Sequence, residues 1–409
     1  MTSRITLIAL IAAITLGAPA LAQSPADPAR KADPKEADPP PIVFFVAKGE
    51  PGACGPGCGE WIAADGTIDR SAGQRLRVLL DRLGKRKPPI YFHSPGGSVS
   101  AAIEIGRMLR AREMTAGVGR TIPQGCDPAQ PREGACDAIK RSGRELVAKL
   151  RTVRTLCNSS CVYALIGAKV REVTAGARIG VHTIAFGEFG QDGSVKSKTG
   201  ALSREDKAKL KAANEYLARY IVSMGIDRDL FEAAAAINHE RVRYISRDEI
   251  ARFGIDRREF HESLWTVDEG PPGPLVVVKF LTEKKGKEPK QYRTTKIELA
   301  CTRARDIRVT FSRELAATDK PASIAVSARG GDFVLPPRRG KPIAGYNDIE
   351  MEDRVARVPI AFFEDAAAGD TIEFAEAPDI SALDKPPPRT KLSTGGLRHA
   401  IGVLSQRCR

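Results

Sequence analysis

The sequence of 409 residues lacks long apolar runs, internal repeats and extended runs of one charge. After the first 22 residues, no stretch reaches the roughly 18 apolar residues that a membrane-spanning helix needs, so no transmembrane segment is expected in the mature chain. Lys and Arg outnumber Asp and Glu by 64 to 50, but they cluster only in short runs such as 85–87. Because no nucleic-acid-binding motif accompanies them, the formal charge of +14 indicates a basic, solvated surface and no nucleic-acid partner.

The composition is that of a folded protein. Hydrophobic residues make up 42% of the chain and charged residues 28%, a balance that excludes a disordered or fibrous protein. At roughly 150 residues per domain, the length predicts two domains or slightly more and excludes a single small module.

The first residues resemble an export signal. Arg4 gives a positive start, residues 5–16 form a short apolar stretch, and Ala20-Leu-Ala22 has the small-x-small pattern that signal peptidase cleaves after. We therefore expect a signal peptide over residues 1–22 and a periplasmic or secreted protein. Residues 23–41, rich in Pro, Ala, Asp and Lys, are expected to form an extended linker.

The eight cysteines agree with export, because an even number of cysteines in an exported chain favours disulfides. Their order predicts the pairs Cys54–Cys58, Cys126–Cys136, Cys157–Cys161 and Cys301–Cys408. An alternative is that the first and third pairs form a four-thiolate zinc site, although the spacing of three residues is not the usual one. We expect no metal and no other cofactor.

Residues 42–265 alternate between strand-like and helix-like segments, which predicts an α/β layered domain. Strands are expected at 42–47, 61–63, 89–93 and 177–182, and helices after Ser71 and Ser98, from Cys136 to about Lys149, at 203–222 and at 246–253. In the last of these helices, Ser246 and Glu249 fit a capping box.

The pattern of alternating strand-like and helix-like segments ends at the Gly- and Pro-rich stretch 269–274. Downstream, strand-like runs at 275–280, 307–311, 323–327 and 358–363 are separated by turns and predict a smaller, mostly-β domain over 274–409. A closing helix is expected within 394–404, tied by Cys408 to Cys301. No motif in this domain indicates a ligand.

Three segments of the first domain occur in an informative order. They are Phe92-His-Ser-Pro-Gly-Gly-Ser98, the segment 157–168 that begins Cys-Asn-Ser-Ser-Cys, and Ala177-Arg-Ile-Gly-Val-His182. This order resembles the Clp protease proteolytic subunit and, more loosely, the signal peptide peptidase and crotonase folds. The resemblance covers about residues 42–258 and implies a Clp/crotonase-like fold in which the segments supply an oxyanion hole, a nucleophilic serine and a base histidine.

A serine hydroxyl becomes a nucleophile only when a neighbouring base takes its proton. The family's spacing places the serine at Asn158, so we predict that Ser159 is the nucleophile, with Ser160 as the alternative, and that His182 is the base. In the competing structural interpretation, both serines only let a disulfide-closed turn pack tightly and His182 is a core residue. A lysine base on the long helix, at one of positions 207, 209 or 211, is a further alternative.

Backbone N–H groups must stabilise the negative oxygen of the intermediate. We predict that Gly97 supplies one N–H and the residue after the nucleophile the other, while Gly96 and Ser98 contribute to binding. The resemblance places Val242 where the family has its aspartate, and the nearest carboxylate, Glu240, is expected on the same strand. Loss of an orienting carboxylate costs about 10⁴ in rate in a serine protease.

The sequence thus predicts an exported Clp-like serine hydrolase, a peptidase acting through an acyl-enzyme on a peptide or protein substrate. The alternative is a catalytically inactive Clp-like domain that binds peptides or an envelope protein partner. The family resemblance also implies self-association, so a homo-oligomer is a further expectation.

Overall fold

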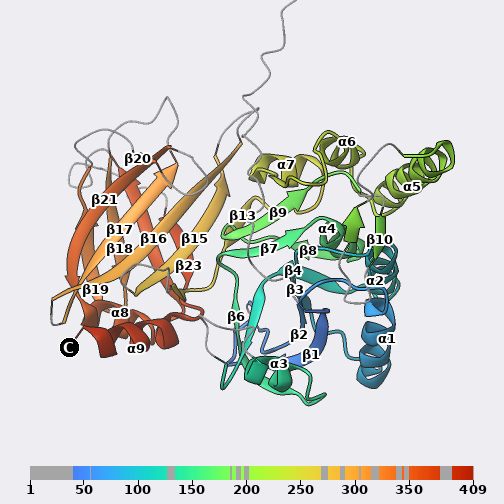
Figure 1. Ribbon diagram of the computed structural model, residues 1–409. Coiled ribbons are helices and arrows are strands. Elements are labelled where there is room, and N and C mark those ends of the chain that lie inside the picture. The colour runs from blue at the N-terminus through green and yellow to red at the C-terminus, as the bar shows by residue number, and fades with distance from the viewer. Residues whose placement is uncertain are drawn as a thin grey trace, which may run out of the picture.

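The computed structural model describes residues 40–55, 57–126, 134–184, 187–189, 195–197, 202–268, 275–285, 291–303, 305–314, 322–337, 343–344, 350–377 and 389–408. The expected signal peptide and nearly all of the expected linker lie outside these residues. The chain forms an α/β half and a mostly-β half that lie side by side (Figure 1). None of the described helices combines the length and apolar character that crossing a bilayer requires.

The α/β half is built on a seven-stranded sheet in the order β5-β6-β1-β2-β3-β4-β8. The strands are β1 (Val43–Lys48), β2 (Glu60–Asp65), β3 (Ile90–His93), β4 (Thr115–Val118), β5 (Arg120–Pro123), β6 (Leu146–Arg151) and β8 (Val170–Glu172). Strands β2, β3, β4 and β8 run parallel to one another, whereas β1 and β2 are antiparallel. All four residues of β3 are buried, which is why this strand is an uninterrupted apolar run in the sequence.

A second sheet has three strands in the order β12-β9-β7. Its strands β7 and β9 end directly before the predicted serines and His182. Strand β7 (Thr155–Asn158) pairs in parallel with β9 (Ala177–Val181), and β12 (Arg243–Tyr244) pairs antiparallel with β9. A bridge between Ser94 and Cys157 joins this sheet to the end of β3.

Helices α1 (Ala72–Leu83), α2 (Val99–Ala111) and α4 (Ser160–Gly167) pack with these sheets in one hydrophobic core. A side chain at Gly167 would overlap the backbone of Gly106, so these glycines allow α2 and α4 to cross closely. Helix α5 (Arg204–Ser223) buries only its C-terminal half, and its other half projects from the molecule (Figure 1). Helices α6 (Asp229–Ala235) and α7 (Arg247–Arg252) follow, and the predicted capping box of α7 is confirmed.

Two sequence-based predictions of secondary structure are wrong. The helix expected to reach about Lys149 ends at Lys140, as α3 (Gly134–Lys140), and β6 follows. In β6 buried and exposed residues alternate, which is the period of a strand lying on a core. The strand expected over 358–363 ends at Pro359, after which α8 (Ile360–Ala366) begins.

The mostly-β half contains two antiparallel sheets, ordered β13-β15-β16-β17-β21-β20 and β19-β18-β22-β23, with β14 also paired to β15. The strands are β13 (Phe260–Glu262), β14 (Thr266–Asp268), β15 (Val276–Lys284), β16 (Tyr292–Arg303), β17 (Asp306–Glu314), β18 (Ser323–Ala328), β19 (Gly331–Leu335), β20 (Ile343–Ala344), β21 (Glu350–Pro359), β22 (Thr371–Ala377) and β23 (Arg389–Ser393). Helices α8 and α9 (Leu397–Arg407) lie at one end of the sheets (Figure 1). The fold is therefore a layered α/β domain followed by a smaller, mostly-β domain, with β13 joining the second sheet system.

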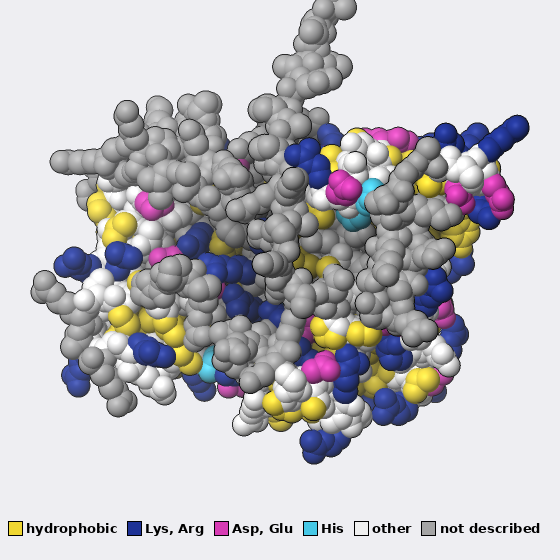
Figure 2. Space-filling view, in the orientation of Figure 1, with side chains coloured by type: hydrophobic (Ala, Val, Ile, Leu, Met, Phe, Trp, Pro, Cys, Tyr) yellow, Lys and Arg dark blue, Asp and Glu magenta, His cyan; other side chains and the backbone are white. Residues whose placement is uncertain are grey.

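The remaining described strands, β10 (Gly187–Phe189) and β11 (Val195–Ser197), pair antiparallel with each other. The surface charge is mixed: Figure 2 shows Lys and Arg side chains on both halves of the visible face, with a group near its centre and acidic side chains among them. This distribution agrees with the even spread of basic residues along the sequence.

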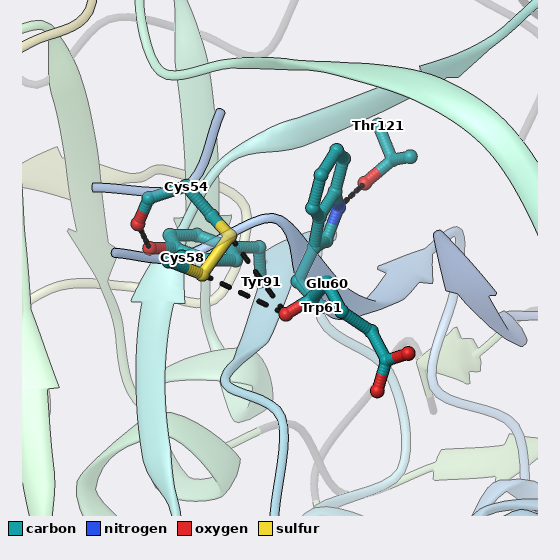
Figure 3. The surroundings of a disulfide bond; sticks show 6 residues. All are labelled: Cys54, Cys58, Glu60, Trp61, Tyr91 and Thr121. Carbon is teal, nitrogen blue, oxygen red and sulfur yellow. Dashed lines mark hydrogen bonds between the residues drawn. A yellow bond between two sulfur atoms is a disulfide. The ribbon is translucent and has the colours of Figure 1, made fainter. Parts of the chain in front are cut away.

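The structure contains the disulfides Cys54–Cys58, Cys126–Cys136, Cys157–Cys161 and Cys301–Cys408, the pairs that their order in the sequence predicts. The first of them lies against the edge of the α/β sheet (Figure 3). There the Tyr91 hydroxyl donates to the carbonyl of Cys54 at 2.9 Å, and the indole N–H of Trp61 donates to the Thr121 hydroxyl at 2.8 Å. The disulfide thus fixes the loop between β1 and β2 on the buried aromatic residues beneath it.

Ion pairs join the two halves. The carboxylate of Asp268, at the end of β14, forms ion pairs with the guanidinium groups of Arg151 at 2.8 Å and Arg154 at 3.0 Å. On another side, the carboxylate of Asp248 in α7 accepts the backbone N–H groups of Gln291 and Tyr292. The β half therefore contacts both β6 and α7 of the α/β half.

Candidate active site

Ser159 stands between the end of β7 and the start of α4, with φ +55° and ψ −127°. Only glycine adopts this backbone conformation without strain, and a non-glycine residue held there costs of the order of 1–3 kcal/mol. A strained serine at a sharp turn from a strand into a helix is the arrangement that presents the nucleophile of α/β-hydrolases. The turn, which we call the elbow (157–161), therefore has the backbone geometry of a nucleophile-bearing turn.

The elbow separates the two candidate serines. Ser160 is fully buried, and its hydroxyl has no hydrogen-bond partner among the described residues. Ser159 is only half-buried. Its N–H donates to the carbonyl of Gly180 at 2.8 Å, and the N–H of Asn158 donates to the carbonyl of Ser94 at 3.0 Å. Backbone hydrogen bonds therefore hold the elbow on both sides. Of the two serines, Ser159 is the more exposed residue.

His182 follows β9 directly and comes to the same edge of the sheet. Asn158 is level with Gly180 in the parallel pair β7–β9, so the elbow and His182 both leave the carboxyl ends of neighbouring strands. Neighbouring strands lie about 4.8 Å apart, which puts the imidazole in the vicinity of Ser159. The structure therefore places the predicted nucleophile and the predicted base at the ends of neighbouring strands.

A backbone carbonyl orients the imidazole. Nδ1 of His182 lies 2.8 Å from the carbonyl oxygen of Thr183. Because a carbonyl can only accept, Nδ1 carries the proton and Nε2 keeps its lone pair. Burial lowers the pKa of His182, the hydrogen bond to Thr183 opposes this shift, and the nearby His239 lowers the pKa further. His182 is accordingly neutral near pH 7, as a general base must be.

The position of the missing acid is occupied by an aliphatic side chain. Arg243 is level with Val181, so Val242 comes opposite His182, and its side chain packs over Gly180. The expectation that Glu240 lies on this strand is wrong, because β12 begins at Arg243 and Glu240 is exposed in the turn before it. His182 is thus oriented by the Thr183 carbonyl and not by a carboxylate.

The glycine turn lies directly over the elbow. A side chain on Gly96 would sit 2.7 Å from Cβ of Ser159 and 3.1 Å from the nitrogen of Ser160. Gly97 has φ +134°, and its neighbours make both backbone hydrogen bonds to Ile68, at 2.7 and 2.6 Å. The N–H of Gly97 therefore points away from Ile68. Only a residue without Cβ allows this approach.

Two backbone donors remain unused at this junction. Neither the N–H of Gly97 nor that of Ser160 donates to any other residue within the described ranges. The Ser160 N–H is also one of the first N–H groups of α4, which have no acceptor within the helix. An oxyanion hole takes its donors from such positions, a glycine turn and the residue after the nucleophile.

The two residues predicted to bind are placed in structural roles. Ser98 is 1% exposed, and its hydroxyl caps α2 by accepting the N–H of Ala101 at 3.3 Å. Gly96 is buried between the elbow and Ile68. Neither placement offers a side-chain contact to a substrate, so both residues position the oxyanion donors instead.

The sequence analysis missed a buried ionic cluster behind the glycine turn. The Lys140 ammonium pairs with Asp65 at 2.5 Å, and both residues are more than nine-tenths buried. Burial raises the pKa of Asp65, but Lys140 and the adjacent His93 outweigh it and hold the pKa below its usual range. Asp65 and His93 are level at the ends of parallel strands β2 and β3, and this shared edge was the signal available in the sequence.

Two alternatives from the sequence are not supported by the geometry. Lys207, Lys209 and Lys211 are all exposed on the projecting half of α5, and Lys209 pairs with Glu205 at 2.6 Å. A lysine base requires a desolvated site, which these positions do not provide. The cysteines proposed as zinc ligands form disulfides, and no group of three or more metal-binding side chains occurs in the part of the chain that is described.

No protein-family model matches the sequence, and no curated protein matches it. Among solved structures, ClpP1 from Listeria monocytogenes is similar over 48% of this chain and 87% of its own, at 14% identity and a TM-score of 0.30. The membrane-bound stomatin-specific protease 1510-N, as a lysine-to-alanine mutant in complex with a substrate peptide, is similar over 47% of this chain and 71% of its own, at 15% identity and a TM-score of 0.30. Similarities this low carry no conclusion about activity.

Proposed function

We propose that this chain is an exported serine hydrolase, a peptidase that cleaves its substrate through an acyl-enzyme. The observation that carries the proposal is the strained Ser159, held beneath a glycine turn whose Gly97 N–H and the neighbouring Ser160 N–H are unused. Strain of this kind persists where the surrounding structure enforces it, and it clusters at active sites. Export is supported by the four disulfides, which are compatible with a secreted protein.

The reaction follows from the positions of these groups. Nε2 of His182 takes the proton of the Ser159 hydroxyl while Oγ bonds to the substrate carbonyl carbon. The carbonyl oxygen becomes negative and accepts the N–H groups of Gly97 and Ser160. The imidazolium then gives its proton to the leaving amine as the C–N bond breaks. Water, deprotonated by His182, hydrolyses the acyl ester and releases Ser159.

Among the described residues no carboxylate pairs with His182, which predicts slow turnover. The Thr183 carbonyl fixes the tautomer, which is one of the roles of the triad aspartate. It carries no net charge, so it stabilises the imidazolium less than a carboxylate does. We therefore place the activity well below that of a complete triad, toward the loss of about 10⁴ seen when the aspartate is replaced.

A catalytically inactive domain that binds peptides or an envelope protein is the second candidate. Val242 opposite His182 favours it, because this position gives no acid to assist the base. Under this alternative the elbow is a folding feature, and the unused N–H groups bind a substrate carbonyl without cleavage.

Fluorophosphonate labelling of the oxidised mature protein, followed by peptide mapping, tests the proposal. We expect a covalent label on Ser159 that is lost in Ser159→Ala and His182→Ala. Ser160→Ala is the matched control, because the neighbouring hydroxyl is buried and its removal should leave labelling intact. If the folded protein shows no label while a control hydrolase reacts, the inactive binding domain is the better description.

A further inference from the structure

A pocket of about 480 Å³ lies in the mostly-β half, between its two sheets. Strands β15 and β17 of the larger sheet form one wall, and β18, β22 and β23 of the smaller sheet form the other. Its volume falls in the range of sites that bind small ligands, roughly 300–1,000 Å³. None of these strands belongs to the candidate active site.

The lining changes from apolar to charged along each strand. Residues two apart on a strand share a face, so successive lining residues report successive depths. The pairs are Leu281 and Glu283 in β15, Phe311 and Arg313 in β17, and Phe374 and Glu376 in β22. All three apolar members are buried. The pocket therefore has an apolar floor and a charged rim.

The rim is the more accessible end. The side chains of Lys285 and Glu376 are 39% and 31% exposed, whereas Leu392 is fully buried and Ile324, which is level with Glu376, is nearly so. Arg313 lies between these levels, with 5% of its side chain exposed. A ligand entering from the rim thus meets charged groups first and apolar groups last.

The charges of the rim are balanced. Arg313 pairs with Glu376 across the two sheets and lies 3.9 Å from Glu352, and Lys285 pairs with Glu283 at 2.6 Å. Buried ion pairs are often replaceable by apolar residues without loss of stability. Stability alone therefore does not account for placing cations and carboxylates together over an apolar floor.

We propose that this pocket binds apolar residues that end in a free α-carboxylate, as at the C-terminus of a peptide. The apolar side chains occupy the floor, the carboxylate faces Arg313 and Lys285, and backbone N–H groups face Glu283 and Glu376. Both signs of charge on the rim then have a counterpart on the ligand. A fatty acid supplies no N–H donor for Glu283 and Glu376, so the rim favours the peptide end over a fatty acid.

The same chemistry belongs to a free apolar amino acid. The pocket volume equals that of about 16 water molecules at 30 Å³ each, which is more than one side chain occupies. The size therefore favours the last two or three residues of a peptide. This inference goes beyond the proposed hydrolase activity and does not depend on Ser159.

Binding is measured by fluorescence anisotropy with the full oxidised chain carrying Ser159→Ala, so that cleavage cannot consume the probe. The probe is a labelled hexapeptide ending in Leu-Val-Phe with a free carboxylate. We expect the same peptide as a C-terminal amide to bind at least about tenfold more weakly, because hydrogen bonds to charged groups are the strong ones. Competition with free phenylalanine distinguishes the two sources: displacement at equal concentration assigns the site to the amino acid, and weaker displacement assigns it to a peptide.

A pair of variants in β23 tests the location. Thr390 lines the pocket from β23, whereas the next residue, Lys391, is on the opposite face with 67% of its side chain exposed. Thr390→Trp should fill the pocket and abolish binding, and Lys391→Trp should leave it unchanged. Circular dichroism and melting of both variants show whether each is folded, and Lys285→Gln, at an exposed position, repeats the charge test without touching the core.

Several results would overturn the inference. These are equal binding of the carboxylate and amide peptides, no effect of Thr390→Trp in a folded variant, preferential binding of palmitate, or no binding of the peptide at millimolar concentration. A failure of fluorophosphonate labelling affects none of these measurements, so the two proposals fail separately.

Discussion

Replacing Ser159 by glycine should remove the proposed nucleophile and stabilise the protein at the same time. With φ +55° and ψ −127°, the residue has the conformation of the first central residue of a type II′ turn, a position that glycine dominates. Serine and alanine both carry a Cβ and are strained there. Ser159→Ala is therefore the matched control, since it removes the hydroxyl and keeps the strain.

The magnitude follows from two opposing effects. Relief of a strained backbone conformation is worth roughly 1–3 kcal/mol. The greater freedom of glycine in the unfolded chain costs about 0.5–1 kcal/mol. The difference predicts that Ser159→Gly is about 1 kcal/mol more stable than Ser159→Ala. For a domain of this size, that free energy corresponds to a rise in melting temperature of roughly 2–4 °C.

Thermal and urea unfolding of the two oxidised variants, followed by circular dichroism, measure the difference. A glycine variant less stable than the alanine variant by the ordinary glycine penalty would refute the claim that the elbow is strained. Loss of several kcal/mol in both variants would instead show that the Ser159 hydroxyl itself supports the fold.

Three further predictions concern protonation and the disulfides. Because burial lowers the pKa of His182, the acid limb of the kcat/KM profile should lie below pH 6.5, and a limb above it would contradict a desolvated base. Removing the disulfide Cys301–Cys408, whose cysteines are 107 residues apart, should lower the free energy of unfolding by about 5 kcal/mol through chain entropy. Removing Cys54–Cys58, whose cysteines are 4 residues apart, should lower it by about 2 kcal/mol, and denaturant unfolding measures both values. Burial, then repulsion by Arg247, lowers the pKa of His261 to about 4, so the unfolded chain binds more protons between pH 6.5 and 4. His261 should therefore lower stability by up to about 3 kcal/mol as pH drops through this window, and His261→Gln should remove this contribution to the pH dependence.

Most elements with a clear periodic pattern were predictable from the sequence. Helix α7 has its predicted capping box, and α5 (Arg204–Ser223) matches the helix predicted over 203–222. The apolar run 162–166 gave no period, because every residue of α4 is buried and no polar face marks the helix. The segment 141–149 was misassigned because the pairing of β6 with β1 and β5 determines its conformation. Such pairing is a tertiary effect that local propensity does not report.

The candidate site was predictable in part. The order of the glycine turn, the serines and His182 is visible in the sequence, and the sheet pairing brings these segments to one edge. The choice between Ser159 and Ser160 depends on backbone conformation and burial, which adjacent identical residues cannot reveal. The orienting group of His182 is a backbone carbonyl, which every residue has, so the sequence cannot show which carbonyl takes this role.

The elbow is held by more contacts than a loop of its length requires. Backbone hydrogen bonds fix Asn158 to Ser94 and Ser159 to Gly180, so two strands hold it from opposite sides. The fully buried disulfide Cys157–Cys161 closes the same five residues. A conformation that costs energy persists only when its surroundings over-determine it. A turn with only a packing role gains nothing from a strained serine, because glycine would serve the same contacts without strain. A strained, half-buried serine at this position therefore fits the proposed nucleophile better than it fits a turn with only a packing role.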